Sequence, residues 1–225
     1  MGDGKLGLCI AEILGRKYLE AVALSKKEET TATTTTTDSS SSNNSSRSSS
    51  SNVSPHPPIL FGKHQHKLDL VSNSGVDRRF VTECYVNTVD IDGGVSTNHA
   101  NQYDVVIDST GNPNGLTLAM SLCRPMGRLV LKSTCAAGVQ GFNSAPIVID
   151  ELTVVGSRCG PIDKALELLA GNSSERIVNG MVVSPPLNME KYITKTFPLS
   201  KVREALEFAA KKSTMKVQLV MGEYE

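Results

Sequence analysis

Short apolar runs alternate with amphipathic segments through the second half of the chain. The runs at 103–108, 128–132 and 152–156 are rich in Val, Ile and Leu, which is typical of strands buried in a parallel sheet. Helices are predicted over 115–122 and 162–170, where apolar residues recur with helical spacing and would form the crossovers between strands. This alternation predicts an α/β fold with a doubly wound parallel sheet.

The chain opens on Gly2-Asp3-Gly4-Lys5-Leu6-Gly7, the spacing of a loop that cradles phosphate groups. In that pattern the first glycine allows a tight turn out of a strand, the second lets the backbone approach a pyrophosphate, and the third lets the next helix pack on the sheet. Apolar residues from Leu6 to Leu14 then predict that helix. Only Met1 precedes the loop where a buried strand belongs, so we expect that the first strand is lost or that the chain is a fragment.

The last segment has a different pattern. A helix is predicted from about 202 to 211, with Ala205, Leu206, Phe208 and Ala209 facing inward. A strand is predicted over 216–220, and its mixed polarity favours an antiparallel or edge position.

Residues 30–54 form a low-complexity segment, in which 18 of the 25 residues are Ser or Thr and three are Asn. Such a stretch has too little apolar surface to offset the entropy of ordering it, so we expect it to be disordered. It lies just before 57–61, where an alternating fold would begin its second strand after a connection of a few residues. An inert insertion or a wrongly joined coding segment is the favoured interpretation, and a phosphorylated linker is the alternative.

Composition excludes several function classes. Lys and Arg total 23, as do Asp and Glu, so charge gives no reason to expect nucleic acid or an anionic membrane as partner. No run approaches the roughly 18 apolar residues of a membrane span, and no secretory signal is evident, so we expect a cytoplasmic location. The five cysteines form no Cys-x-x-Cys pair, and His64 and His66 lack an evident third ligand, so we expect reduced thiols and no metal site. The absence of Tyr-x-x-x-Lys and Gly-x-Ser-x-Gly argues against a short-chain dehydrogenase and a hydrolase.

Small and polar residues follow each predicted parallel strand, at the edge where open α/β sheets bind their ligands. We therefore predict a cofactor site at that edge. The same residue types also fit capping and turn roles, and the pattern leaves both roles open. Besides Asp108, the residues at this edge are Ser109, Thr110, Gly111, Lys132, Ser133, Ser157 and Arg158.

Six blocks of residues carry a resemblance to a known family. They are Gly2–Gly7, 62–68, 104–111, 127–134, 153–161 and the closing stretch 197–217. In this order they resemble the C-terminal half of the medium-chain dehydrogenase/reductases, the zinc alcohol dehydrogenase superfamily. The resemblance implies an incomplete Rossmann-type fold without its first strand and without the family's N-terminal GroES-like domain. The family's zinc ligands have no matching positions here, so we expect the chain to be inactive by itself.

The resemblance divides the chain into four parts. Residues 1–24 would form the glycine loop and first helix of the dinucleotide-binding domain, and 25–57 the disordered insertion. Residues 58–190 would form the remainder of that domain. Residues 191–225 correspond to the helix and strand that return to the catalytic domain in the family.

The residues after the second predicted strand bear on the choice of cofactor. NAD-selective sites place an Asp or Glu there, which accepts hydrogen bonds from the ribose 2′-hydroxyl. Here Ile59–Phe61 is followed by Gly62, which leaves room, and then by Lys63 and His64, with Lys67 nearby. These basic side chains suit a 2′-phosphate, which favours NADP(H) over NAD(H). Solvated surface charges are the alternative explanation.

Two functions remain open. The first is an NAD(P)-binding module in which Gly2–Gly7, including Lys5 and Leu6, holds the pyrophosphate; intact relatives would transfer hydride between NAD(P)H and an alcohol or aldehyde. The second is a non-catalytic interaction protein that pairs through its last strand with a full-length relative, or more generally as a homo- or heterodimer. Binding of the reduced cofactor separates the two. Loss of the first strand removes the middle of the 3-2-1-4-5-6 strand order, so we also expect marginal stability.

Overall fold

The structure is a computed structural model that describes residues 2, 4–32, 56–72, 83–86, 99–134, 143–170, 177–178, 181–182 and 187–222. Its helices are α1 (Lys5–Ala32), α2 (Gln65–Ser72), α3 (Pro113–Leu122), α4 (Ala145–Ile149), α5 (Ile162–Ala170) and α6 (Val202–Ala209), with the 3-10 turns η1 (Glu190–Tyr192) and η2 (Leu199–Lys201). Its strands are β1 (Ile59–Gly62), β2 (Glu83–Val86), β3 (Tyr103–Asp108), β4 (Cys123–Leu131), β5 (Thr153–Gly156), β6 (Ile177–Val178), β7 (Met181–Val182), β8 (Ile193–Pro198) and β9 (Lys216–Val220).

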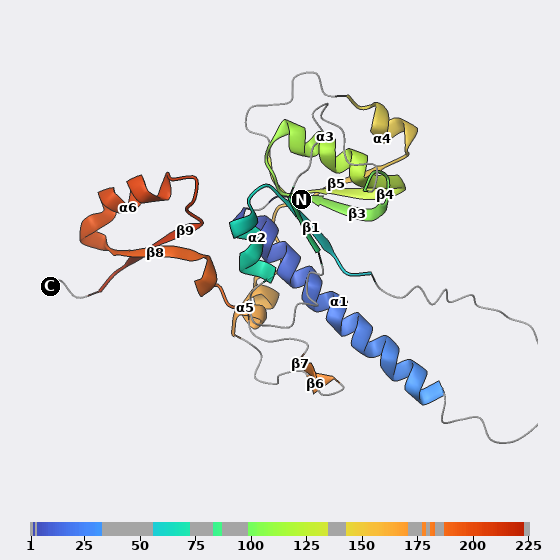
Figure 1. The fold of residues 1–225 in the computed structure, drawn as a ribbon, viewed down its shortest axis with the longest axis horizontal. Coiled ribbons are helices and arrows are strands. Elements are labelled where there is room, and N and C mark those ends of the chain that lie inside the picture. The colour runs from blue at the N-terminus through green and yellow to red at the C-terminus, as the bar shows by residue number, and fades with distance from the viewer. Residues whose placement is uncertain are drawn as a thin grey trace, which may run out of the picture.

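The first five strands are arranged as two parallel sheets. Strand β1 pairs with β2, while β4 lies between β3 and β5. Helices α3 and α4 lie on one side of these strands, and α1 and α2 lie on the other (Figure 1). Parallel strands with helices on both sides confirm the predicted doubly wound α/β fold.

Most element bounds follow the sequence pattern closely. Strands β3 and β9 and helix α5 have the predicted bounds, and β1, β5 and α3 differ from them by one or two residues. Strand β4 begins earlier than predicted, at Cys123. Within β4, Met126 has a φ of +61° and its N–H donates to the carbonyl oxygen of Asp150 at 2.7 Å, and the pairing of β4 with β3 is irregular between Tyr103 and Val105.

The closing segment differs from the prediction in two respects. Strand β9 pairs parallel to β8 because α6 forms a crossover between them, so the antiparallel alternative was wrong; the two strands form a two-stranded sheet. Ala205 is buried and Phe208 is half-buried, as expected, but Leu206 is 68% exposed and Ala209 is exposed too. A sheet of two strands is too narrow to cover the whole apolar face of α6.

Helix α1 continues to Ala32, past the boundary expected at residue 24 (Figure 1). Residues 26–28 are Lys-Lys-Glu, which are good helix formers and allow this extension. The rest of the Ser/Thr-rich segment, residues 33–54, lies outside the described residues. Neither α1 nor any other described helix is both long and apolar enough to cross a membrane.

Among the described residues, the core forms two clusters rather than one. The first lies around α1, β1 and α2 and includes Leu8, Leu60 and Leu68. The second lies around β3, α3 and β4 and includes Leu122 and Leu129. The boundary between the clusters falls between β1 and β3, which is the place of the first strand in the expected strand order.

Candidate functional site

The glycine loop packs against the carboxyl ends of β1 and β3. Gly2 has a φ of +106°, which favours glycine, and its N–H donates to the carbonyl oxygen of Phe61 at 2.9 Å. At Gly7, a Cβ would lie 1.9 Å from the carbonyl oxygen of Gly2 and 2.9 Å from Ser109 Oγ. Both positions therefore require glycine, and the loop lies at the point where the strand order reverses.

The middle of the loop is open. A Cβ built at Gly4 would have no atom of the described residues within 4 Å. The carbonyl oxygen of Gly4 accepts the N–H of Leu8 at 3.1 Å, so α1 begins directly after the loop. The N–H groups of Lys5, Leu6 and Gly7 have no acceptor within the helix, by the geometry of a helix N-terminus. Open space beside such amides is suited to an anion.

The turn after β3 is held by Asp108. This side chain is 2% exposed, and its Oδ1 accepts the N–H of Thr110 at 3.0 Å and the hydroxyl of Thr110 at 2.7 Å. Two residues further on, Asn112 Oδ1 accepts the N–H of Asn114 at 2.9 Å and caps α3. Asp108 and Thr110 therefore have the turn role that the sequence left open.

The ends of β4 and β5 are tied to their neighbours by side chains predicted for the site. Gly111, with a φ of +63°, donates its N–H to Ser133 Oγ at 2.8 Å. Lys132 Nζ donates to Ser157 Oγ at 3.3 Å and to the carbonyl oxygen of Arg158 at 3.0 Å. The structure thus brings these five residues together as braces between three loops at the carboxyl edge, and contact with a ligand remains a prediction for each.

The basic residues predicted to select the cofactor follow β1 at the same edge. Strand β1 ends at Gly62, which is buried, and α2 begins a few residues later. Between them Lys63 and His64 are exposed, and Lys67 in the first turn of α2 is half-buried. The N–H of Lys67 donates to the carbonyl oxygen of His64 at 2.9 Å. This edge therefore carries positive charge next to β1, the strand whose Phe61 carbonyl oxygen accepts the N–H of Gly2.

A family model described as zinc-binding dehydrogenase matches residues 57–171, slightly more than half of the chain. The chain belongs to the zinc-binding dehydrogenase family. The resemblance to the C-terminal half of these enzymes is thereby confirmed. A search of the curated proteins found no match.

Solved structures share the fold at low sequence identity. L-idonate 5-dehydrogenase from Escherichia coli is 20% identical with a TM-score of 0.54, and the match covers 72% of this chain and 42% of that one. A protein from Sinorhizobium meliloti described as a zinc-binding dehydrogenase is 18% identical with a TM-score of 0.54, covering 72% and 44%. TarJ from S. aureus is 17% identical with a TM-score of 0.60, covering 98% and 55%. This family member therefore spans about half the length of the structures it matches, or less.

The described residues do not fit the zinc centre that the family's name implies. Cys9, Cys123 and Cys159 lie in α1, at the start of β4 and after β5. In the part of the chain that the structure describes, no group of three or more His, Cys, Asp or Glu side chains could hold a metal ion. We therefore assign no step to a metal.

A buried polar cluster that none of the sequence predictions included lies beneath α1. Glu12 is 7% exposed, accepts the Tyr192 hydroxyl at 2.8 Å and forms an ion pair with Lys191. Burial, followed by the adjacent carboxylate of Glu12, raises the pKa of the Tyr192 hydroxyl. Burial also lowers the pKa of Arg16, whose side chain is near the cluster. Helical spacing could have revealed it, because Glu12 and Arg16 follow Leu8 on the buried face of the helix.

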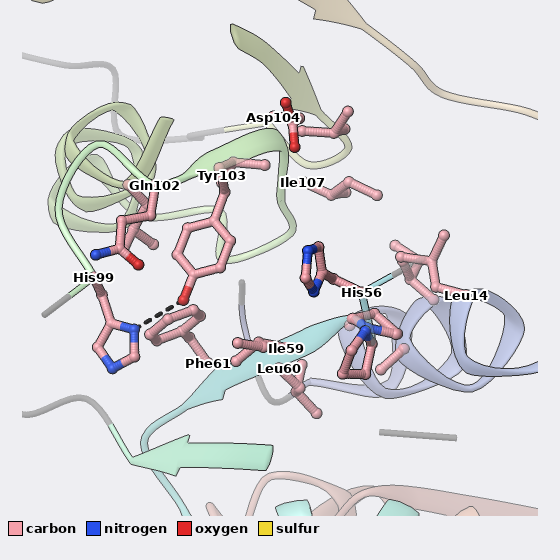
Figure 2. A pocket seen from close by; sticks show the side chains of 18 of the residues that line it. Leu14, His56, Ile59, Leu60, Phe61, His99, Gln102, Tyr103, Asp104 and Ile107 are labelled. Atoms are coloured by element: carbon pink, nitrogen blue, oxygen red, sulfur yellow. Dashed lines mark hydrogen bonds between the residues drawn. The ribbon is translucent and has the colours of Figure 1, made fainter. Parts of the chain in front are cut away.

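A pocket of about 830 Å³ lies between β1 and β3 and is bounded by α1. Figure 2 shows that aromatic side chains from β1 and from the β3 side of the pocket meet. The Phe61 ring contacts the His99 and Tyr103 rings edge-on, with centroid distances of 5.4 Å to His99 and 5.9 Å to Tyr103. His99 Nδ1 and the Tyr103 hydroxyl are 2.8 Å apart and share a hydrogen bond. The pocket includes Gly7 at one end and extends along the strands, away from the basic residues that follow β1.

Proposed function

We propose that this chain is the nucleotide-binding module of an alcohol-dehydrogenase-type oxidoreductase and that it binds NADP(H) in preference to NAD(H). The glycine loop carries the proposal, because Gly2 and Gly7 fit only as glycines while Gly4 borders open space at the start of α1. Membership of the zinc-binding dehydrogenase family supports the same class of ligand. The bound nicotinamide supplies the hydride in such enzymes.

The residues of this chain bind and orient the cofactor. The backbone of Gly2–Gly7 and the helix N-terminus would hold the pyrophosphate. Ser109 to Gly111 would border the cofactor after β3, at a position fixed by the Asp108 turn. The hydrogen bonds of Lys132 keep the next two loops in place at this edge. The remaining proposed contacts are Ser133, Ser157 and Arg158.

The preference for NADP(H) depends on the residues after β1. Among the solved neighbours, a Sinorhizobium meliloti protein is bound to NADP and an E. coli protein to NADH, so the fold allows either cofactor. In this chain Gly62 is followed by Lys63 and His64, and Lys67 lies one turn on. A 2′-phosphate would meet positive charge there, whereas the ribose hydroxyl of NAD would find no carboxylate in those positions.

Titration of the purified chain with NADPH and NADH tests the proposal, with the fluorescence of the reduced nicotinamide as the signal. The chain has no tryptophan, so no indole emission interferes. We expect saturable binding, tighter for NADPH, and a loss of that preference in Lys63→Glu. Lys201→Glu, an exposed lysine in η2, is the matched control and should bind as the wild type does. Equal affinities for both cofactors would refute the preference, and a folded chain that binds neither would refute the module.

We also propose that the chain by itself does not transfer hydride. It spans 42% to 55% of the solved enzymes that it matches, and its described residues provide no zinc centre. The measurement is the change in nicotinamide absorbance when the NADP⁺-loaded chain is mixed with a panel of primary and secondary alcohols. Turnover by the chain alone would contradict this part of the proposal.

The second candidate function is pairing with another chain through β9. In the described part of the chain β9 pairs with β8 alone, and Leu219 and Val220 on it are 38% and 42% exposed. Such an edge can accept a further strand. Light scattering of the wild type and of Val220→Lys tests this role, because a dimer formed through β9 should dissociate in the variant.

A further inference from the structure

The pocket between β1 and β3 is bordered by two strands that lack a common neighbour. In the part of the chain that the structure describes, β1 pairs with β2 alone and β3 pairs with β4 alone. Helix α1 closes the pocket from one side with Ile10, Ala11 and Leu14 (Figure 2). We call this space the β1–β3 slot.

The position of Gly2 shows which end of the slot lies at the carboxyl ends of β1 and β3. Gly2 donates its N–H to Phe61 in β1 and lies against Ser109, which directly follows β3. Residues that precede or begin the two strands, among them Pro58 and Gln102, line the same pocket. The two strands therefore enter the slot at one end and leave it beside Gly2. A peptide that lay parallel to both would have its carboxyl end at the glycine loop.

The lining of the slot suits an apolar backbone strand. Its side chains are mainly aliphatic and aromatic, and Val105 in β3 is 54% exposed. The carbonyl oxygen of Asp108 accepts the N–H of Lys132, which directly follows β4, so by the alternation of a strand the backbone groups of Val105 face away from β4. Strands buried on both faces of a parallel sheet consist mostly of Val, Ile and Leu.

We propose that the β1–β3 slot binds an extended, apolar strand of another polypeptide, parallel to β1 and β3. Such a strand would join the sheet of two strands and the sheet of three into one continuous sheet. In the 3-2-1-4-5-6 order it takes the first position, between β1 and β3. Its backbone supplies hydrogen bonds to both neighbours, and its side chains fill the gap between the two core clusters.

A synthetic peptide of the length of β3, 6 residues, tests this site. Its residues are valine and isoleucine, with an added lysine at the amino end that carries a fluorescent label. We expect its fluorescence anisotropy to rise saturably with the full chain in the absence of any nicotinamide cofactor. The control peptide has the same side chains but N-methylated central amides, which cannot form the ladder, and it should not bind. Absence of binding by the first peptide, or equal binding of both, would overturn the proposal.

Variants of α1 locate the site. Leu14→Glu places a charge in the wall of the slot and should weaken peptide binding about tenfold or more, the scale of losing one buried leucine contact. Leu24→Glu, farther along the same helix and 51% exposed, should bind as the wild type does. Hydrogen exchange gives a measurement on the unchanged chain: the peptide should slow exchange of the Val105 amide. Unchanged exchange at saturating peptide would place binding elsewhere. Nicotinamide titration is a separate readout, so failure of this site leaves the proposed function untouched.

Discussion

Substitution of Gly7 by alanine has two effects of opposite sign on the free energy of unfolding. Gly7 lies in the first turn of α1, and alanine is favoured over glycine in a helix by about 1 kcal/mol. The added Cβ, however, would lie 1.9 Å from the carbonyl oxygen of Gly2, a separation that real Cβ atoms essentially never show. The obstacle is backbone, so no side-chain rotation relieves it.

The loop must therefore move away from α1, and the contacts of Gly2 are lost with it. Forcing an extra carbon into a packed position costs about 1–3 kcal/mol. The hydrogen bond from Gly2 to Phe61, 2.9 Å long, contributes about 0.5–1.5 kcal/mol. After the gain in helix propensity, we expect Gly7→Ala to lower the free energy of unfolding by about 1–3 kcal/mol.

Urea denaturation followed by circular dichroism measures this change. Gly4→Ala is the matched control, because its Cβ would meet no described atom within 4 Å and its stability should change by less than about 1 kcal/mol. Gly4→Ala should nevertheless weaken NADPH binding if the cofactor approaches the backbone there. A Gly7→Ala chain as stable as the wild type, or more stable, would refute the close contact between the loop and α1.

Four further predictions concern stability and thiol chemistry. Asp108→Ala removes the acceptor of both Thr110 hydrogen bonds and should cost about 1–3 kcal/mol in urea denaturation; an unchanged midpoint would contradict the turn role. The pKa of Tyr192 is raised in the folded chain, so the stabilisation is complete below its ordinary value of 10.0 and is lost as pH rises above it. Stability should therefore fall in alkaline denaturation series, and less steeply in Tyr192→Phe. Burial and then Glu12 raise the pKa of Cys9, so iodoacetamide should label the exposed Cys159 before Cys9, as peptide mass mapping would show. Thermal unfolding without ligand should have a midpoint below about 65 °C, and a cooperative transition above it would contradict marginal stability.

The local sequence pattern predicted the parallel strands and the glycine loop well. The run Tyr103–Asp108 is short, β-branched and ends at a turn residue, and the structure gives β3 the same bounds. Spacing alone singles out Gly2 and Gly7, and both positions favour glycine in the structure: Gly2 has a φ of +106°, and a Cβ at Gly7 would clash with Gly2 and Ser109. Such features depend on residues close together in the chain, which is why sequence pattern captured them.

Features that depend on distant residues were not accessible in this way. Glu12 accepts a hydrogen bond from Tyr192, which lies 180 residues further along the chain. Helical spacing can place Glu12 on the buried face of α1, but no pattern within α1 identifies Tyr192 as its partner. The polarity of β9 suggested an antiparallel or edge strand, because α6 covers only part of its small sheet and leaves Leu219 exposed. The residues at the carboxyl edge were predicted as a group, but the hydrogen bonds that make Lys132 and Ser133 braces arise from the register of β4 against β5 and against β3, respectively.

The glycine loop also connects the two halves of the core. Gly2 is hydrogen-bonded to β1, which belongs to the first cluster, and lies against Ser109, which follows a strand of the second. A cofactor bound at Gly2–Gly7 would therefore contact both halves at their junction and favour the state in which they are joined. At a hundredfold excess over its dissociation constant, such a ligand adds about 2.7 kcal/mol to stability. That is a large share of the roughly 5–15 kcal/mol of an ordinary domain. Cofactor binding and the integrity of this fold are thus one coupled equilibrium, because the residues that would hold the phosphates also join the sheets.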